Sequence, residues 1–234
     1  AAEKFRLTAD GEIGLGGANY GTDGQVLTSA GAGAAAAWED VSGGITFKSE
    51  GTNFTDSLLV GHSTTGTLNN ANGNTIVGID AGDAIAGGDY NVMVGYAAGT
   101  AVTSGTTSVY VGKYAGQLAT NSAGCVAIGN NTLGDADPDN YNVAVGINAG
   151  KAITGASNLC LGSYAGDNIT SGSGNVVIGK ADVSSATGDD QLSISDGEDG
   201  SVVWISGEST GNVEVAVNWN PSLSTTGKAF VMGF

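Results

Sequence analysis

The segments YNVMVGYAAG (residues 90–99) and YNVAVGINAG (residues 141–150) decide the fold, because they are nearly identical and lie three times seventeen residues apart. Over the middle of the chain a glycine follows a short apolar run at intervals of 17 residues, with a single interval of 16. These glycines are Gly61, Gly78, Gly95, Gly112, Gly129, Gly146, Gly162 and Gly179. Eight copies of so regular a unit indicate a repeat architecture.

Each repeat carries one strong strand pattern just before its glycine. The residues three and one positions before the glycine are apolar and mostly β-branched, and we expect them to share the buried face of a strand. They are Leu58, Val60, Thr75, Val77, Val92, Val94, Val109, Val111, Val126, Ile128, Val143, Val145, Leu159, Leu161, Val176 and Ile178, with Thr75 the exception to the apolar rule. Apolar residues that return seven positions after the glycine (Ile85, Val102, Ile153, Ile169) predict a weaker second strand.

One 17-residue unit is too thin to bury a core alone, but stacked copies can do so. The sequence therefore predicts an all-β fold: a parallel β-solenoid of about eight 17-residue coils, most simply a two-sided β-roll. At the ~4.8 Å spacing of paired strands, eight coils would make a rod roughly 38 Å long. Identical positions would then form ladders along the rod.

The middle residue of each strand, two positions before the glycine, points to the opposite face. The eight residues are uncharged and mostly apolar: Leu59, Ile76, Met93, Tyr110, Ala127, Ala144, Cys160 and Val177. A strand that is apolar on both faces is buried on both, and one thin coil covers only one of them. The flanking segments of the chain could cover the second face. We favour other copies of the chain, which makes these eight residues the candidate interface of an intertwined parallel homotrimer.

Short strands flank the repeats and give three predicted segments. Residues 1–48 open with FRLTADGEIGLG (residues 5–16), whose alternating apolar residues around a glycine turn predict a β-hairpin. Residues 49–185 form the solenoid. Residues 186–234 form a β-meander with strands around Leu192, Val203 and Val213, followed by an apolar strand in KAFVMGF (residues 228–234). Such units would cap the open ends of the solenoid.

The two cysteines lie in coils two apart, so we expect their backbones to be ~9.6 Å apart. This distance exceeds the ~7 Å limit for a disulfide. Cys125 and Cys160 are therefore predicted to be free, buried thiols.

Composition excludes several classes of protein. The chain has 41 glycines among 234 residues without a collagen period, and its formal net charge is −16 with only seven scattered basic residues. So negative a surface repels phosphate backbones and anionic headgroups, so we expect no nucleic-acid binding. No apolar run approaches the ~20 residues of a membrane helix, so we expect no membrane insertion. The start, Ala-Ala-Glu without a methionine, suggests a processed or truncated chain.

No enzyme is predicted, because the candidate catalytic and nucleotide-binding motifs are incomplete. GHSTT (residues 61–65) lacks the spacing of a hydrolase nucleophile elbow, and GLGGAN (residues 14–19) misses the last glycine of the dinucleotide fingerprint. His62 is expected at the surface of a coil corner. Carboxylate pairs suited to glycoside hydrolysis remain an open alternative.

An acidic cluster near the end of the solenoid is the one candidate for a hard cation such as calcium. It comprises Asp182, Asp189, Asp190, Asp196, Glu198 and Asp199. Its spacing fits neither the EF-hand loop nor the nonapeptide calcium repeat. We therefore favour solvated turn carboxylates and predict no cofactor.

Three tyrosines follow the coil glycine by one or two residues and are expected to face outward at the corners. Tyr96, Tyr114 and Tyr164 could stack on the sugars of a surface glycan, although packing at the corner is the simpler explanation.

Several motifs carry a resemblance to known families. TDGQVLTSAGAGAAAAW (residues 22–38) resembles a segment common in bacteriophage tail fibres, and TTGKAFVMGF (residues 225–234) resembles the end of tail-fibre proteins from marine phages, particularly cyanophages. The coils, such as NVAVGINAG (residues 142–150), are similar to the repeats of YadA-like adhesin heads, which are trimeric parallel β-rolls. The coil length differs from that family, and serine or cysteine replaces its asparagine at Ser57, Ser108 and Cys125.

The resemblance implies a virion component outside the cell: a trimeric phage tail fibre, or a segment of one, that forms a rigid rod and contributes to host attachment. Its partners would be itself, other virion tail proteins and a glycan or protein receptor on the host surface. A bacterial trimeric surface adhesin head and a polysaccharide depolymerase tailspike are the alternatives. An ice-binding or calcium-dependent solenoid is disfavoured, since neither a Thr-x-Thr ladder nor a calcium repeat is present.

Overall fold

A computed structural model describes residues 5–7, 9, 13–15, 25–28, 36–40, 47–51, 53–61 and 65–215. The chain divides into two compact units, residues 1–46 and 47–234. The described residues of both units form β-strands and turns and no helix, so the chain is all-β as predicted.

The first unit contains two antiparallel strand pairs. Strand β1 (Phe5–Leu7) pairs with β2 (Ile13–Leu15), which confirms the predicted hairpin. Strand β3 (Gln25–Thr28) pairs with β4 (Ala37–Asp40), and Trp38 lies opposite Leu27.

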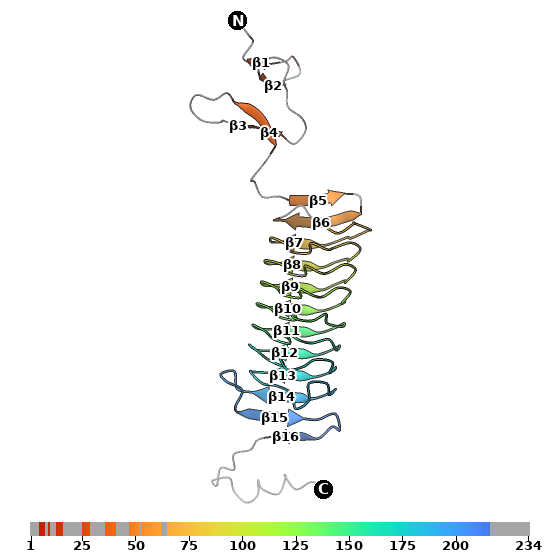
Figure 1. Cartoon of the computed structure of the whole chain (residues 1–234), viewed down its shortest axis with the longest axis vertical. Helices are drawn as coiled ribbons and strands as arrows, with labels where there is room; N and C mark the ends of the chain where they lie inside the picture. The colour runs from red at the N-terminus through yellow and green to blue at the C-terminus, as the bar shows by residue number, and fades with distance from the viewer. Residues whose placement is uncertain are drawn as a thin grey trace, which may run out of the picture. The chain divides into compact units, whose positions relative to one another are not determined.

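The second unit contains one continuous sheet of twelve strands in sequence order (Figure 1). The strands are β5 (Phe47–Gly51), β6 (Phe54–Val60), β7 (Thr75–Val77), β8 (Val92–Val94), β9 (Val109–Val111), β10 (Val126–Ile128), β11 (Val143–Val145), β12 (Leu159–Leu161), β13 (Val176–Ile178), β14 (Leu192–Ser195), β15 (Val203–Gly207) and β16 (Val213–Val215).

The strands β6 to β14 are parallel and stacked in register, which confirms the predicted solenoid with its repeat of 17 residues. Leu59 pairs with Ile76, Ile76 with Met93 and Met93 with Tyr110. The strand register is kept across the one repeat of 16 residues, because Ala144 still pairs with Cys160. The missing residue is therefore absorbed in the turns between strands.

Antiparallel strands close both ends of this sheet. Strand β5 pairs antiparallel with β6, and β15 and β16 follow β14 as an antiparallel meander. Strand β14 was predicted to belong to the meander, but it pairs in parallel with β13 and so extends the solenoid by one strand. The predicted strand in residues 228–234 lies outside the described residues.

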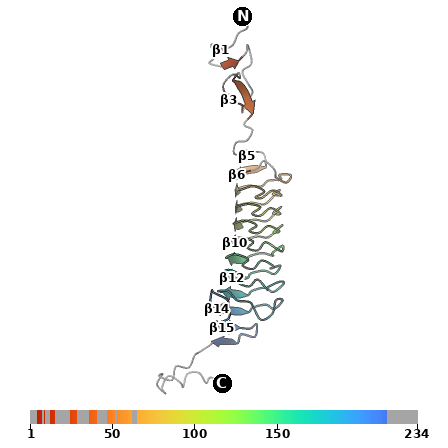
Figure 2. The same cartoon turned by 60° about the vertical axis from the view of Figure 1, so that its left-hand side comes forward.

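The predicted second strand of each coil is wrong. The strands stack along one side of the coils, and turns form the remainder of each described coil (Figure 2). The apolar residues expected in that strand nevertheless face the interior, since Ile85, Val102, Ile153 and Ile169 are all buried. The coil is thus one sheet closed by turns, and not a two-sided roll.

The predicted inside and outside faces of the strand are exchanged in the structure. The middle residues, from Leu59 to Val177, are 0% exposed within a single chain and form the core. They cannot form an interface with another copy, so that prediction is wrong. The flanking positions face outward instead, and Leu58, Val77 and Ile128 are each about two-fifths exposed (40%, 37% and 41%).

Side-chain size is compensated across the narrow core. Where the middle residue is the large Tyr110, the same coil has Gly116 at the facing corner, and a methyl group there would collide with the tyrosine ring. Where the middle residue is the small Ala127, the corresponding corner holds Leu133, which is fully buried. The middle residues are thus packed as core residues, because a large side chain at the middle position faces a small residue at the corner and a small one faces a large residue.

Candidate binding surfaces

The coil glycines form the predicted column, in which each lies against the next. Their φ angles lie between 123° and 139° from Gly61 to Gly162, a region that side chains avoid. A methyl group on Gly95 would also lie 2.7 Å from the carbonyl carbon of Gly112. Glycine is therefore required at this corner for two independent reasons. The glycine column also sets the spacing of the residues that flank the strands.

A buried polar ladder runs beside the core at the position four residues before each glycine. The side-chain oxygen of Asn74 accepts the backbone N–H of Asn91 at 2.9 Å, and that of Asn158 accepts the N–H of Asn175 at 3.0 Å. The amide nitrogen of Asn91 reaches the carbonyl of Gly105 at 2.8 Å. Asparagine recurs at this position in the sequence, but the recurrence alone does not predict a hydrogen-bonded ladder.

The two cysteines are free and buried, as predicted. Cys125 occupies the polar ladder, and its thiol contacts the carbonyl of Asp139 at 3.3 Å. Cys160 occupies the apolar middle column, where burial raises the pKa of its thiol to about 12. Neither cysteine has the electropositive, accessible surroundings of a reactive thiol.

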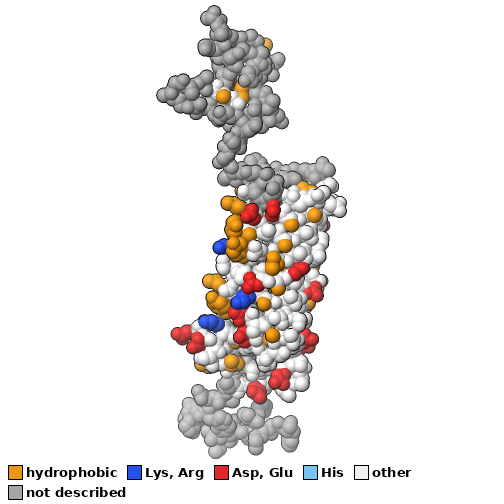
Figure 3. Space-filling model, viewed as in Figure 1, with side chains coloured by type: hydrophobic (Ala, Val, Ile, Leu, Met, Phe, Trp, Pro, Cys, Tyr) orange, Lys and Arg blue, Asp and Glu red, His pale blue; other side chains and the backbone are white. Residues whose placement is uncertain are grey.

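The outward side of the parallel strands forms a regular surface. We call it the valine face and define it as the flanking residues Leu58, Val60, Thr75, Val77, Val92, Val94, Val109, Val111, Val126, Ile128, Val143, Val145, Leu159, Leu161, Val176 and Ile178. It contains no charged residue, although the chain carries a net charge of −16. All of these residues are partly or largely exposed. In the view of Figure 3, which labels no single residue, hydrophobic side chains gather along one edge of the described coils, beside basic side chains.

The edge that follows the strands carries the three tyrosines singled out from the sequence. Tyr96 and Tyr164 are exposed and Tyr114 is half-buried, so the outward orientation is confirmed. The Tyr96 and Tyr114 rings meet edge to face with centroids 5.5 Å apart. Lys113 Nζ lies 4.6 Å from the Tyr114 ring centroid and Lys180 Nζ lies 5.5 Å from that of Tyr164. These rings therefore have partners within the chain.

The edge that precedes the strands carries two more exposed tyrosines, which the sequence pattern did not single out. Tyr90 and Tyr141 are 65% and 64% exposed, more than any tyrosine of the opposite edge. They occupy the same position in their coils, five residues before the glycine, with φ angles of 59° and 63°. The duplicated segments that reveal the repeat both begin with these two residues.

The acidic cluster is dispersed by the fold. Asp196 accepts four backbone N–H groups of its own loop, among them that of Val202 at 2.8 Å, and these bonds lower its pKa to about 2. Burial and a hydrogen bond to Asp167 raise the pKa of Asp182. Within the described ranges, no three His, Cys, Asp or Glu side chains lie together as a metal site.

Asp167 and Asp182 are an interacting acidic pair, since Asp167 helps to raise the pKa of Asp182. Lys151 forms an ion pair with Asp167 at 3.5 Å.

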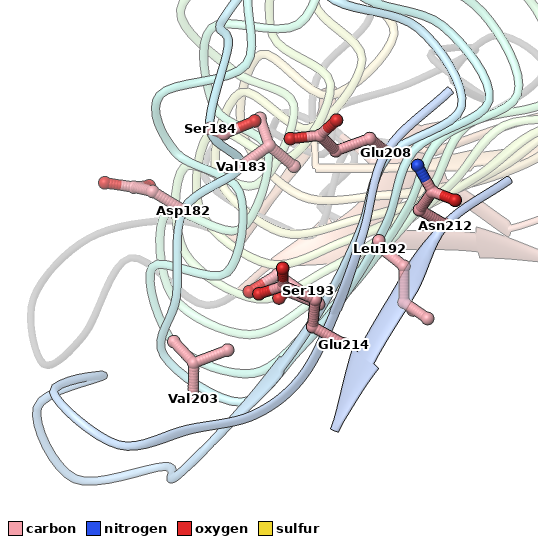
Figure 4. Close-up of a pocket in the computed structure, with 11 residues that line it drawn as sticks. Asp182, Val183, Ser184, Leu192, Ser193, Val203, Glu208, Asn212 and Glu214 are labelled. Atoms are coloured by element: carbon pink, nitrogen blue, oxygen red, sulfur yellow. The ribbon is translucent and has the colours of Figure 1, made fainter. Parts of the chain in front are cut away.

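A pocket of about 400 Å³ is lined by the turn after β13, by β14 and by the meander strands β15 and β16 with the turn between them (Figure 4). Asp182, Glu208 and Glu214 line it together with small polar and aliphatic residues. It includes neither a basic nor an aromatic side chain, so it lacks the groups that would hold an anionic or a flat ligand.

The remaining predictions and comparisons add no site. His62 lies outside the described residues. In the part of the chain that the structure describes, no helix is long and apolar enough to cross a membrane. Comparison of the chain with models of known protein families, with curated proteins and with solved structures gives no match.

Proposed function

We propose that this chain is a structural and adhesive virion component: a trimeric phage tail fibre, or a segment of one, whose copies associate through the valine face. The observation that carries the proposal is this uncharged apolar face, which follows eight stacked strands on an otherwise acidic rod. Exposed apolar surfaces of this extent mark sites of protein association.

A second copy of the chain is the partner that fits this face. The face repeats at the ~4.8 Å interval of paired strands, and another copy in parallel orientation repeats at the same interval. Its partly exposed side chains offer on the order of 700 Å² of apolar surface, close to the ~800 Å² that each partner contributes to a stable complex. Three copies arranged around one axis would cover the face on every chain.

The interior suits a part that resists force and proteolysis. In-register backbone hydrogen bonds, a continuous apolar core and the asparagine ladder connect each coil to the next. A stiff rod of this kind can hold a receptor-binding surface away from the particle, and its repeated coils can combine weak contacts with a host glycan or protein. The antiparallel strands at its ends would join other tail proteins.

The oligomeric state in solution tests the proposal. Sedimentation equilibrium of the full chain should give three times the chain mass of 22.9 kDa. Leu161→Lys, in the valine face, should give monomers because three buried charges would meet at the axis. Leu118→Lys is the matched control, since Leu118 is equally exposed (45% against 44%) but lies outside the face. A wild-type chain that remains monomeric at micromolar concentration would overturn the proposal.

A further inference from the structure

The edge that precedes the strands holds its two tyrosines in a repeated, supported arrangement. Each tyrosine ring lies against a glycine of the preceding coil. A methyl group on Gly73 would lie 2.8 Å from Cε1 of Tyr90, and one on Gly124 would lie 2.8 Å from Cδ1 of Tyr141. The same arrangement, a tyrosine ring packed on a glycine of the preceding coil, therefore occurs twice, at the same position of coils that are three apart.

The backbone at this position is left-handed in every coil from Asp56 to Asp190. Large side chains rarely adopt this conformation, and glycine, serine, threonine or aspartate fills the other coils. The two tyrosines are therefore the unusual choice here, and most of the surface of each remains exposed.

A polar side chain stands immediately before each tyrosine. One oxygen of Asp89 accepts the backbone N–H of Asn72 at 2.7 Å, and the side-chain oxygen of Asn140 accepts that of Ala123 at 2.7 Å. These bonds fix both groups against the preceding coil. The second oxygen of Asp89 and the amide nitrogen of Asn140 have no partner within the described residues, and so can bond to a ligand.

We propose that Tyr90 and Tyr141, with Asp89 and Asn140, form a binding site for a neutral oligosaccharide that runs along the rod. A sugar presents C–H groups that pack on an aromatic ring and hydroxyl groups that bond to carboxylate and amide groups beside it. The two rings are ~14 Å apart along the axis, so one extended chain of sugars can contact both.

The charges around this edge favour a neutral sugar. Lys113 and Lys180 lie at the opposite edge of the strands, and Lys151 is paired with Asp167. An anionic polysaccharide would meet Asp89 on a chain of net charge −16, and the described residues of this edge offer no free cation to hold it. The site rests on the proposed function, for which it supplies the class of receptor and the residues that contact it.

Titration of the full chain with neutral hexose oligosaccharides of two to eight units, on an array and by calorimetry, tests the site. Binding should strengthen at least tenfold once the oligosaccharide is long enough to reach both rings. Tyr90→Ala or Tyr141→Ala should remove this length dependence, and the double variant should lose binding. Tyr90→Phe should bind within about twofold of wild type, since the ring is retained.

The matched control is the double variant Tyr96→Ala, Tyr164→Ala at the opposite edge, which should bind as wild type does. Loss of binding in that control, or no wild-type binding to any neutral oligosaccharide, would overturn the site. Sedimentation of every variant separates the two proposals. If Tyr90→Ala and Tyr141→Ala dissociate the oligomer, the edge belongs to the interface between copies and the site is wrong. A monomeric wild type with length-dependent binding would retain the site and refute the trimer.

Discussion

Gly78 lies directly against Gly95, so that a methyl group on Gly78 would be 2.7 Å from the carbonyl carbon of Gly95. The same relationship links each coil glycine to the next, and all share a backbone conformation that favours glycine. Gly95→Ala should therefore strain its own backbone and separate two coils, with a loss of about 3 kcal/mol or more in the free energy of unfolding. Chemical denaturation monitored by circular dichroism measures this loss.

Gly197→Ala provides the control for that prediction. Gly197 lies in a loop, has no positive φ angle and has no neighbour within 4 Å of the added methyl group. Its substitution should change stability by less than about 0.5 kcal/mol. Equal losses for the two variants would show that the glycine column does not hold the coils together.

The two cysteines should respond in opposite directions to the same substitution. Ser57 and Ser108 in the polar ladder each accept the backbone N–H of the next coil through their hydroxyl oxygens, at 2.9 and 3.1 Å. Cys125→Ser should replace the weak contact between the thiol and the N–H of Asn142 by such a bond and stabilise the chain by about 1 kcal/mol. Cys160→Ser places a hydroxyl group in an apolar column and should destabilise it by about 1–3 kcal/mol.

Thermal unfolding of the two serine variants under reducing conditions distinguishes these environments. A stabilised Cys160→Ser variant would mean that its column is not apolar. A destabilised Cys125→Ser variant would mean that the thiol packs better than the hydroxyl group bonds. In the native wild type, neither thiol should react with an alkylating reagent at pH 8, because both are buried.

The Tyr110 hydroxyl group is buried without a hydrogen-bond partner among the described residues. Burial also raises its pKa, as expected for a group that cannot ionise easily in an apolar interior. Tyr110→Phe removes the unpartnered oxygen and keeps the ring, so stability should be unchanged or increase by about 1 kcal/mol. Tyr110→Ala, which leaves a cavity against Gly116, should lose about 3–5 kcal/mol.

The repeat length and the parallel stack could be predicted from the sequence, because a strict glycine period has few structural solutions. The sequence did not predict which strand residues face the core and which face outward. Val109 and Val111 are as apolar as Tyr110 and Ala127, so hydrophobicity alone does not show which side faces the core. The informative feature was side-chain size. The large Tyr110 is combined with Gly116 and the small Ala127 with Leu133, which indicates that the middle residues and these corner residues fill the same enclosed core.

The proposed sugar site at the edge that precedes the strands could not be predicted from the sequence for a different reason. Tyr90 and Tyr141 stand in the sequence as the first residues of the duplicated segments, where they look like the start of a strand. Their exposure follows from a left-handed backbone and from Gly73 and Gly124 one coil earlier. That relationship becomes visible only once the register of the coils is known.

Asp196 should make the stability of the last loop depend on pH in the acidic range. Four backbone N–H groups bond to its carboxylate and hold its pKa at about 2, below the ~3.9 of an unfolded aspartate. Because the folded pKa is the lower one, the stabilising contribution is fully present above about pH 4 and is lost as the pH falls towards 2. Asp196→Asn should remove this contribution at neutral pH and should match the wild type near pH 2. Carboxyl NMR titration and thermal unfolding between pH 2 and 6 measure both effects. The control is Glu208→Gln, whose carboxylate has no hydrogen-bond partner within the described residues, and a pH-dependent gap for Glu208→Gln as large as that for Asp196→Asn would contradict the prediction.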